Sequence, residues 1–396
     1  MYVSSGSHRP SPIEFQAISR CANRVNSMDL HLPAAEMRQV LQDPGLSLEN
    51  VSQLRLRTTS PESGMIHLQV APPSLSCLIL EGVTINWSAI SNLTHLHLCK
   101  IDGPSAPSTA DLRSILRLSP SIHTLVLDRV NIIPTIAVFH VYPNQLQQLR
   151  INLNPIYAKK ILRGVKIPPV TQVELEASTH DLEEILGHHD QRRHHIRTPT
   201  LATLSLESKK IVLSRSTSAP FSEDGYRIII RLVNNMDVRA LNPISKVFTL
   251  NNIKTLELKF MHPDHKNLVV SLQILRDFLK PMRLLTTLWV SQALAGIVVP
   301  ILGESSMPDN VICPNLWWLY LGDPDQYWWG FPQRLPVLLM VDGSNLSSMG
   351  CTRGQHVQVT AVGGVEFLGK GKIEIDYAQM RLRNFVGGVE SHLTNL

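Results

Sequence analysis

Apolar residues recur along this chain in a six-residue frame, at the first, fourth and sixth positions. Eleven segments fit this frame if leucine, valine, isoleucine and methionine are treated as equivalent. They are residues 25–30, 51–56, 75–80, 93–98, 122–127, 146–151, 170–175, 201–206, 253–258, 285–290 and 316–321. Their starts lie 18 to 32 residues apart, except for one step of 52 residues between Leu201 and Ile253. Most steps are close to the period of about 20–29 residues that is typical of leucine-rich repeats.

The frame also predicts how each segment is buried. Side chains alternate in an extended segment, so the fourth and sixth positions share one face and the residues between them share the other. We therefore expect His95, His97, Glu174 and Glu257 to be exposed, and the core leucines to be buried, among them Leu78, Leu80, Leu96, Leu98, Leu125, Leu127, Leu256 and Leu258. One strand cannot bury its leucine row alone, but parallel strands stacked edge to edge form a continuous core. The return segments need apolar stripes of their own, and helix-like stripes occur at 34–41, 111–118, 157–163, 181–186 and 268–279. Pro120 and Pro281 follow two of these stripes, where proline ends a helix and favours extended backbone.

These patterns predict the α/β class and a leucine-rich-repeat solenoid. A curved parallel sheet would form its concave face, and helices or irregular legs its convex face. We expect residues 1–14 to be an N-terminal tail, residues 15–330 the solenoid, and residues 331–396 a C-terminal cap or tail. The step of 52 residues indicates one degenerate repeat near 226–232. Within the C-terminal segment, an apolar run at 335–341 precedes a glycine-rich turn at Gly363 and Gly364 and one possible strand at 372–376. A cap, a small appended domain and an altered gene end all remain open for it.

Composition narrows the function classes. The formal net charge is +5, from 37 Lys+Arg and 32 Asp+Glu, and no run of five basic residues occurs, so a nucleic-acid groove is not indicated. The five cysteines are scattered without CxxC spacing, which argues against a disulfide framework or a zinc knuckle. The first residues lack the pattern of a signal peptide, and no apolar stretch reaches the roughly 18 residues of a membrane helix. We expect a cytoplasmic or nuclear protein without a membrane association.

The residues between the leucines are the candidate binding residues, because the frame places them on the concave surface. A basic start, a more acidic middle and an aromatic end follow one another along this surface. Exposed Trp, Tyr and Arg side chains are frequent anchors of protein interfaces. The candidate partner-binding residues are Arg55, Arg57, His95, His97, Arg150, Glu174, Glu257, Trp289, Trp318 and Tyr320.

No metal, cofactor or catalytic site is predicted. His95, His97 and Cys99 share one strand face, but neighbours on such a face lie nearly 7 Å apart, which is wide for one tetrahedral ion. A polar segment at 188–195 holds four histidines without the helical pairing of a zinc site, and we interpret it as a mobile insertion. The segment 364–371 resembles a phosphate loop but has glycine where Ser or Thr would hold magnesium. No hydrolase or metalloprotease motif is present.

Two segments carry a family resemblance. Residues 112–127 (LRSILRLSPSIHTLVL), together with residues 82–98 (GVTINWSAISNLTHLHL), resemble the repeat region of the F-box proteins of mushroom-forming fungi. Residues 18–30 look like the first repeat of that group, although Val25 stands where the family usually has tryptophan. The resemblance covers about residues 15–325 and implies a leucine-rich-repeat fold. It also implies a role in which the repeats capture a protein substrate for a cullin ubiquitin ligase.

We expect the F-box of the family pattern to be missing or truncated in this chain. In the family this helical module precedes the repeats and docks on a Skp-type adaptor subunit, but residues 1–14 are too few for three helices. Residues 32–41 (LPAAEMRQVL) are similar to the F-box opening, yet they fall where a return helix is required. We therefore expect a non-catalytic protein-binding module, a substrate-recognition adaptor of the F-box kind. The alternatives are a stand-alone scaffold or decoy receptor, and an enzyme with an unrecognised site in residues 331–396.

Overall fold

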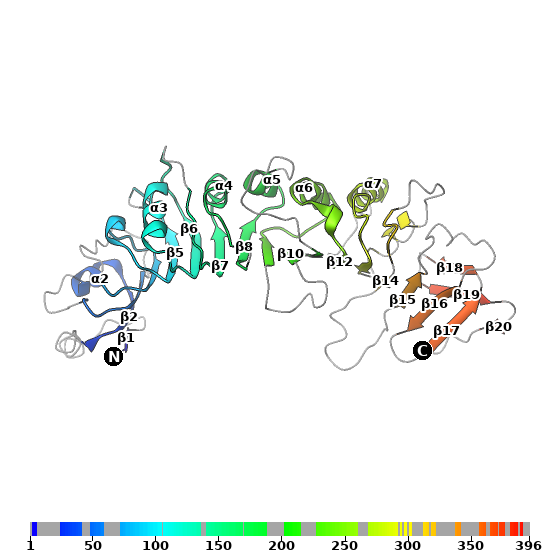
Figure 1. The fold of residues 1–396 in the computed structure, drawn as a ribbon, viewed down its shortest axis with the longest axis horizontal. Helices are drawn as coiled ribbons and strands as arrows, with labels where there is room; N and C mark the ends of the chain where they lie inside the picture. The colour runs from blue at the N-terminus through cyan, green and yellow to red at the C-terminus, as the bar shows by residue number, and fades with distance from the viewer. Residues whose placement is uncertain are drawn as a thin grey trace. The chain divides into compact units, whose positions relative to one another are not determined.

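The fold is that of a computed structural model (Figure 1). It is a mixed α/β fold with mostly parallel sheet strands. The structure describes residues 2–5, 24–41, 48–58, 72–104, 106–135, 140–168, 170–187, 202–214, 227–259, 268–291, 294, 297–298, 301–302, 312–316, 318–321, 337–341, 356–361, 365–370, 372–376, 381–386 and 389–390. The chain divides into two compact units. The first consists mainly of Met1–Ala177 and the second mainly of Thr198–Leu396.

The described strands of the first unit form an open parallel sheet in the order of the sequence. Each strand from β2 to β8 pairs in parallel with the strand before it. The strands are β1 (Tyr2–Ser5), β2 (Ser27–Leu32), β3 (Gln53–Thr58), β4 (Cys77–Glu81), β5 (His95–Ile101), β6 (Thr124–Val130), β7 (Gln148–Asn152) and β8 (Gln172–Ala177). Seven predicted frames thus become seven neighbouring parallel strands, β2 to β8.

The register places equal frame positions opposite one another. The fourth positions form one row, and the sixth positions form a second row of the same kind on the same face. The fourth-position row is Met28, Leu54, Leu78, Leu96, Leu125, Leu149 and Val173, and the sixth-position row is Leu30, Leu56, Leu80, Leu98, Leu127, Ile151 and Leu175. All of these side chains are buried, so the two rows form the core of the first unit.

Strand beginnings are joined by a repeated hydrogen-bond pattern at the second frame position. The backbone carbonyl of Asn26 accepts from the amide of Ser52 at 2.8 Å, and the carbonyl of Ser52 accepts from the amide of Ser76 at 2.8 Å. Hydroxyl groups add to the pattern, because Ser76 Oγ donates to the Ser52 carbonyl (3.0 Å) and Thr94 Oγ1 donates to the Ser76 carbonyl (2.9 Å). These bonds satisfy polar groups at the strand ends and fix each strand against its predecessor.

Helices lie between the strands where the apolar stripes predict them. They are α2 (Ala34–Leu41), α3 (Thr109–Leu118), α4 (Pro155–Gly164) and α5 (Asp181–Leu186), with a short 3-10 turn, η2 (Trp87–Ala89). The capping box of α3 joins Ser108 and Asp111, and the helix ends at Leu118, just before Pro120. In Figure 1, α3 and α4 lie on the same side of the first unit's strands. Of the helices in the described part of the chain, none is long and apolar enough to cross a membrane.

The second unit continues the frames but interrupts them once. Its strands β9 (Thr203–Glu207), β12 (Thr255–Leu258), β13 (Thr287–Val290) and β14 (Trp318–Leu321) pair in parallel, in that order. A strand, β11 (Arg227–Leu232), lies where the degenerate repeat was predicted near 226–232, but it does not pair as a parallel repeat strand. It pairs antiparallel with an unpredicted strand, β10 (Lys210–Ser214), which itself pairs antiparallel with β9. The long step therefore holds an antiparallel excursion, and β12 pairs directly with β9.

The helices of the second unit follow the same logic. They are α6 (Leu241–Val247) and α7 (Leu268–Leu279), with 3-10 turns η4 (Val238–Ala240) and η5 (Leu250–Asn252). The helix α7 has the bounds that its apolar stripe predicts, whereas α6 was not predicted. Pro281 follows the end of α7 by two residues, as expected for a corner between a helix and a strand.

The C-terminal segment forms antiparallel strands. The strands β15 (Val337–Val341), β16 (His356–Ala361) and β17 (Val365–Lys370) continue from β14 with antiparallel pairing. A separate antiparallel sheet contains β18 (Lys372–Asp376), β19 (Arg381–Val386) and β20 (Val389–Glu390). The single strand predicted at 372–376 is confirmed, but the segment contains more strands than its sequence pattern indicated.

Candidate binding face

The candidate site is the surface of β2–β8 opposite the leucine rows, which we call the polar face. Three rows run across the strands with one residue per strand, two rows over β2–β8 and the third over β2–β7. The first row is Ser27, Gln53, Cys77, His95, Thr124, Gln148 and Gln172; the middle row is Asp29, Arg55, Ile79, His97, Val126, Arg150 and Glu174; the third is His31, Arg57, Glu81, Cys99, Asp128 and Asn152. Six of the predicted binding residues lie here: Arg55, Arg57, His95, His97, Arg150 and Glu174.

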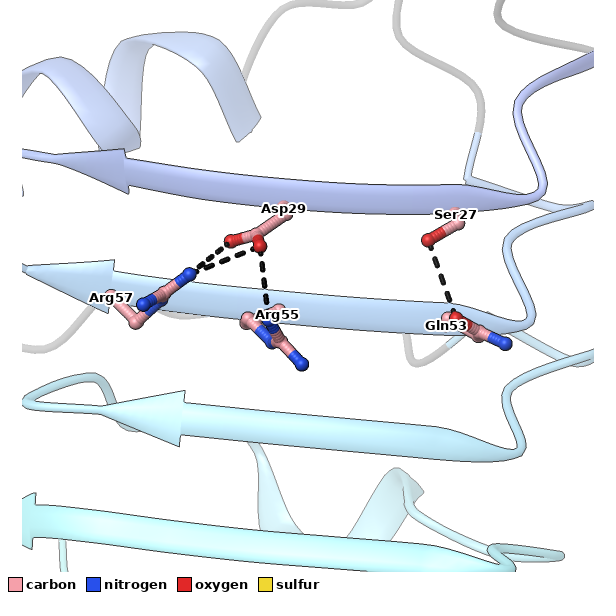
Figure 2. A network of polar contacts seen from close by, with 5 residues as sticks. All are labelled: Ser27, Asp29, Gln53, Arg55 and Arg57. Carbon is pink, nitrogen blue, oxygen red and sulfur yellow. Dashed lines mark hydrogen bonds and ion pairs between the residues drawn. The ribbon is translucent and has the colours of Figure 1, made fainter. Parts of the chain in front are cut away.

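At the β2 end of the polar face, one carboxylate holds two arginines (Figure 2). Arg55 Nη1 donates to Asp29 Oδ2 at 3.2 Å, and Arg57 Nη2 donates to both oxygens of Asp29 at 3.1 and 3.0 Å. The Asp29 side chain is only 9% exposed, whereas those of Arg55 and Arg57 are 45% and 35% exposed. The guanidinium groups therefore present this cluster to solvent. Beside it, Ser27 Oγ donates to Gln53 Oε1 at 3.5 Å (Figure 2).

The centre of the middle row is apolar or weakly polar. Ile79 is half-buried and Val126 is buried, and His97 lies between them. Burial lowers the pKa of His97, with the Asp128 carboxylate acting in the opposite direction. The neutral imidazole therefore dominates at neutral pH. In the first row, the His95 side chain is exposed, and its ring stacks on the ring of His123 with centroids 6.4 Å apart.

At the β8 end, an arginine again covers a carboxylate. Arg150 Nε lies 4.0 Å from Glu174 Oε1, and the two side chains are 41% and 9% exposed. Our expectation that Glu174 is exposed was therefore wrong. The frame correctly places Glu174 on the polar face, but burial on that face depends on its long neighbours. An arginine stem can cover adjacent surface while its charged head stays in water.

The third row contains a small polar network around Asp128. Its carboxylate accepts from Cys99 Sγ at 3.3 Å and from Asn152 Nδ2 at 2.7 Å. Burial raises the pKa of Asp128, but these hydrogen bonds and the neighbouring Arg129 guanidinium together outweigh it and hold that pKa below its usual range. Burial and the bond to Asp128 raise the pKa of Cys99 to about 11, so its thiol stays protonated and is a poor nucleophile.

A bend in the backbone ends the polar face at the same level on three adjacent strands. Gly82, Lys100 and Arg129 all have positive φ angles, of 63°, 49° and 52°. After this bend, Ile101 and Val130 return to the core side and are buried. The bend also directs the Lys100 ammonium to Glu81, with Nζ 2.6 Å from Oε1, and this hydrogen bond holds the pKa of Glu81 below its usual range.

The other predicted residues belong to the second unit. Glu257 was expected to be exposed but is buried, so that prediction was also wrong. Its Oε2 lies 3.2 Å from Lys259 Nζ, and since this oxygen has no hydrogen-bond partner among the described residues, the contact is an ion pair. The two residues are two positions apart on one strand face, so they shelter each other. Trp289 is half-buried, and its register partners are Glu257 and Tyr320. The side chains of Trp318 and Tyr320 lie outside the described part of the structure, although their backbones form β14.

The candidates for metal binding are not brought together within the described residues. No group of three or more His, Cys, Asp or Glu side chains there could hold a metal ion. Instead, His95 stacks on His123, and His97 lies beside Val126. Cys99 donates a hydrogen bond to Asp128. The histidine-rich segment at 188–195 lies outside the described residues.

Three contributors to the polar face were absent from the predicted set. Asp29 binds both arginines at the β2 end, Asp128 organises the third row, and His123 stacks on His95. The signal for Asp29 was in the frame, because it has the same fifth position in its hexamer as Arg55 in the next one. Asp128 follows its hexamer directly and could have been found by extending the frame by one residue. His123 is a second-position residue, for which alternation predicts no place on this face.

The described part of the polar face offers groups for non-covalent contacts. The carboxylates of Asp29, Glu81, Asp128 and Glu174 are paired with cations or held by hydrogen bonds, and the Cys99 thiol is protonated at neutral pH. Arginine groups at both ends and an apolar centre are the features of a recognition surface. Comparison of the chain with models of protein families and with curated proteins finds no match.

Proposed function

We propose that this chain is a leucine-rich-repeat solenoid whose polar face binds another protein. The observation that carries the proposal is the zero-offset register of β2 to β8. Because equal frame positions stand opposite one another, the side chains between the leucines form continuous rows across seven strands. Such a broad, rigid surface suits a macromolecular partner better than a small ligand, which requires a concave pocket.

The composition of the polar face supports a protein partner. Arg55, Arg57 and Arg150 present partly exposed planar groups, and Ile79 adds apolar surface between them. Arginine is enriched at the energetic centres of protein interfaces. The acidic residues that hold these arginines also restrain their rotamers, which lowers the entropy lost on binding.

The resemblance to fungal F-box proteins extends this proposal to a ubiquitin-ligase adaptor, in which the captured protein would be presented to catalytic partner subunits. Residues 32–41, which are similar to the F-box opening, contain α2. This helix follows β2 as a return helix of the repeats, and its Met37 is fully buried. The ligase link therefore rests on the family resemblance and needs a separate test. Co-purification of a Skp-type subunit with the full chain would support it, and its absence would favour a stand-alone scaffold or decoy receptor.

The binding function itself can be tested by site-specific photo-crosslinking. A photoreactive phenylalanine analogue replaces His97 at the centre of the polar face, and in a control protein it replaces Arg117, an exposed residue of α3. Both proteins are incubated in a native lysate and irradiated. We expect a defined crosslinked protein with the probe at position 97 only. Equal crosslinking from both positions, or no crosslink from position 97, would contradict the proposed function.

A further inference from the structure

In each ion pair that the described residues form on the polar face and at its edge, the cation is more exposed than its carboxylate. The exposed fractions of cation and carboxylate side chains are 45% and 9% for Arg55–Asp29, 35% and 9% for Arg57–Asp29, 51% and 30% for Lys100–Glu81, 63% and 16% for Arg129–Asp128, and 41% and 9% for Arg150–Glu174. With the half-buried Glu176, five cations stand against five carboxylates, so the formal charges balance. The cations and carboxylates differ in exposure, because the cation of each pair is the more exposed to solvent.

An approaching partner meets the exposed charges first. The sheltered carboxylates contribute mainly to holding the arginines in place, whereas the guanidinium groups can still donate hydrogen bonds outward. The surface therefore favours negatively charged groups although its residues sum to zero charge.

The spacing along the middle row limits what such a partner looks like. Arg55 and Arg150 are four strand steps apart, which corresponds to roughly 19 Å at about 4.8 Å per step. His97 lies midway, with Ile79 and Val126 on either side of it. An extended peptide in the polyproline II conformation has three residues per turn and rises about 3.1 Å per residue, so side chains three residues apart share one face and lie about 9 Å from each other, close to the spacing between the centre and each arginine.

We infer that the polar face binds an acidic, extended protein segment that crosses the strands. This inference rests on the proposed function. The segment places an apolar side chain over Ile79, His97 and Val126, and a carboxylate near each of Arg55 and Arg150. Its pattern is an acid, two residues, an apolar residue, two residues and a second acid. The apolar centre favours a protein segment over nucleic acid, whose regularly spaced phosphates would find cations only at the ends of this row.

The inference is tested with labelled peptides and the full chain. The probe is Glu-Ala-Ala-Leu-Ala-Ala-Glu with Gly-Ser flanks, and its controls carry Lys in place of both Glu residues or Ala in place of Leu. Fluorescence polarisation should show saturable binding of the acidic probe that weakens with added salt, because exposed charges are screened. The lysine peptide should not bind, and the peptide without leucine should bind more weakly.

Matched variants assign the binding to this row. Arg55→Met and Arg150→Met keep most of the side-chain stem, and Asp29 keeps Arg57 as its partner in the first of them. Each variant should bind the acidic probe with about fivefold lower affinity, which is the effect expected from losing one exposed charge pair. The double variant should bind it more weakly still. Arg117→Met on α3 is the control and should bind as the parent protein does. Thermal melting confirms that each variant is folded.

The possible outcomes separate this inference from the proposed function. Three results would overturn the inference of an acidic segment. They are binding of the lysine peptide, no binding of the acidic probe, and full binding of the acidic probe by the double variant. If crosslinking from position 97 still captures the same protein in the Arg55→Met/Arg150→Met variant with equal yield, the proposed function stands and the inference fails. If position 97 captures nothing in the parent protein either, the proposed function has failed.

Discussion

Replacing Arg55 and Arg57 together should destabilise the first unit more than replacing the carboxylate that binds them. Asp29 accepts three hydrogen bonds from the two arginines and is the sheltered member of the cluster. If Asp29 becomes alanine, water can hydrate both guanidinium groups, because each is at least a third exposed. If both arginines become alanine, the carboxylate loses these partners while it stays largely away from solvent. The two changes remove the same contacts but leave different groups unsatisfied.

The magnitudes follow from this difference in exposure. Exposed ion pairs contribute about 0.2–1 kcal/mol each, so Asp29→Ala should lower the free energy of unfolding by about 1–2 kcal/mol. An uncompensated buried charge costs about 3–5 kcal/mol. Taking up a proton sets an upper limit on that cost, because protonating an ordinary aspartate at pH 7 requires about 4 kcal/mol. We therefore expect a loss of about 3–4 kcal/mol for Arg55→Ala/Arg57→Ala.

Urea unfolding of the parent protein, both variants and the triple variant measures these differences. Hydrogen exchange of the β2 and β3 amides accompanies it, because the two units can unfold separately and a single midpoint would then mislead. The triple variant should be about as stable as Asp29→Ala alone. Near pH 4.5 the penalty of the double arginine variant should shrink, since protonation becomes inexpensive. A double variant that loses no more stability than Asp29→Ala at pH 7 would refute the reasoning.

Four further predictions address the core, the bend at Gly82, the half-buried His97 and the aromatic end. Leu125→Ala removes a core side chain that is 1% exposed and should cost about 2–5 kcal/mol in urea unfolding; a loss below about 1 kcal/mol would contradict the assigned register. Gly82→Ala forces a side chain into positive φ and brings its Cβ within 2.4 Å of Thr58 Cγ2, so a loss above the strain of about 1–2 kcal/mol is expected, and adding Thr58→Ser should recover the part due to the clash. Burial lowers the pKa of His97, so the unfolded chain takes up a proton there before the folded protein does, and the folded protein should lose stability as the pH falls below the unfolded-state pKa of about 6.5. NMR titration of His97 should show the low pKa, and His97→Gln should flatten the pH dependence of stability. Trp289→Ala should weaken the binding of a partner that contacts the aromatic end by about 2 kcal/mol; because Trp289 is half-buried, thermal melting first checks that the variant is folded, and an unaltered affinity of the folded variant would place the contact elsewhere.

Strand positions were predictable because one periodic constraint determines them. Each frame needs its leucines on one face, and a shift of one residue would expose the whole row, so the pattern admits a single register. The eight leucines that the frame predicts to be buried are buried: Leu78, Leu80, Leu96, Leu98, Leu125, Leu127, Leu256 and Leu258. Helix positions were nearly as well defined, since α2, α5 and α7 have the bounds of their apolar stripes.

The frame failed where the chain keeps its hydrophobic pattern but changes its pairing. The strand β11 is as apolar as a repeat strand, yet hydrophobicity does not encode whether its neighbour runs parallel or antiparallel. A smaller failure occurs at the start of β8, where Val170 opens the hexamer but is 68% exposed. The buried residue there is Thr171, whose Oγ1 donates to the Leu146 carbonyl at 2.6 Å. A hydroxyl that replaces a leucine in this way leaves no hydrophobic signal.

Burial on the polar face was the least predictable property, and it matters most for function. Alternation correctly assigned Glu174 to the outer face, but depth on that face depends on whether a long neighbour covers the residue. Arg150 does so for Glu174, and Arg55 and Arg57 do so for Asp29, because an arginine stem covers a short side chain more readily than the reverse. A sequence gives each charge equal weight, so it predicts a basic start and a more acidic middle for this surface. The structure weights the charges by exposure, and the sign that a partner encounters becomes positive.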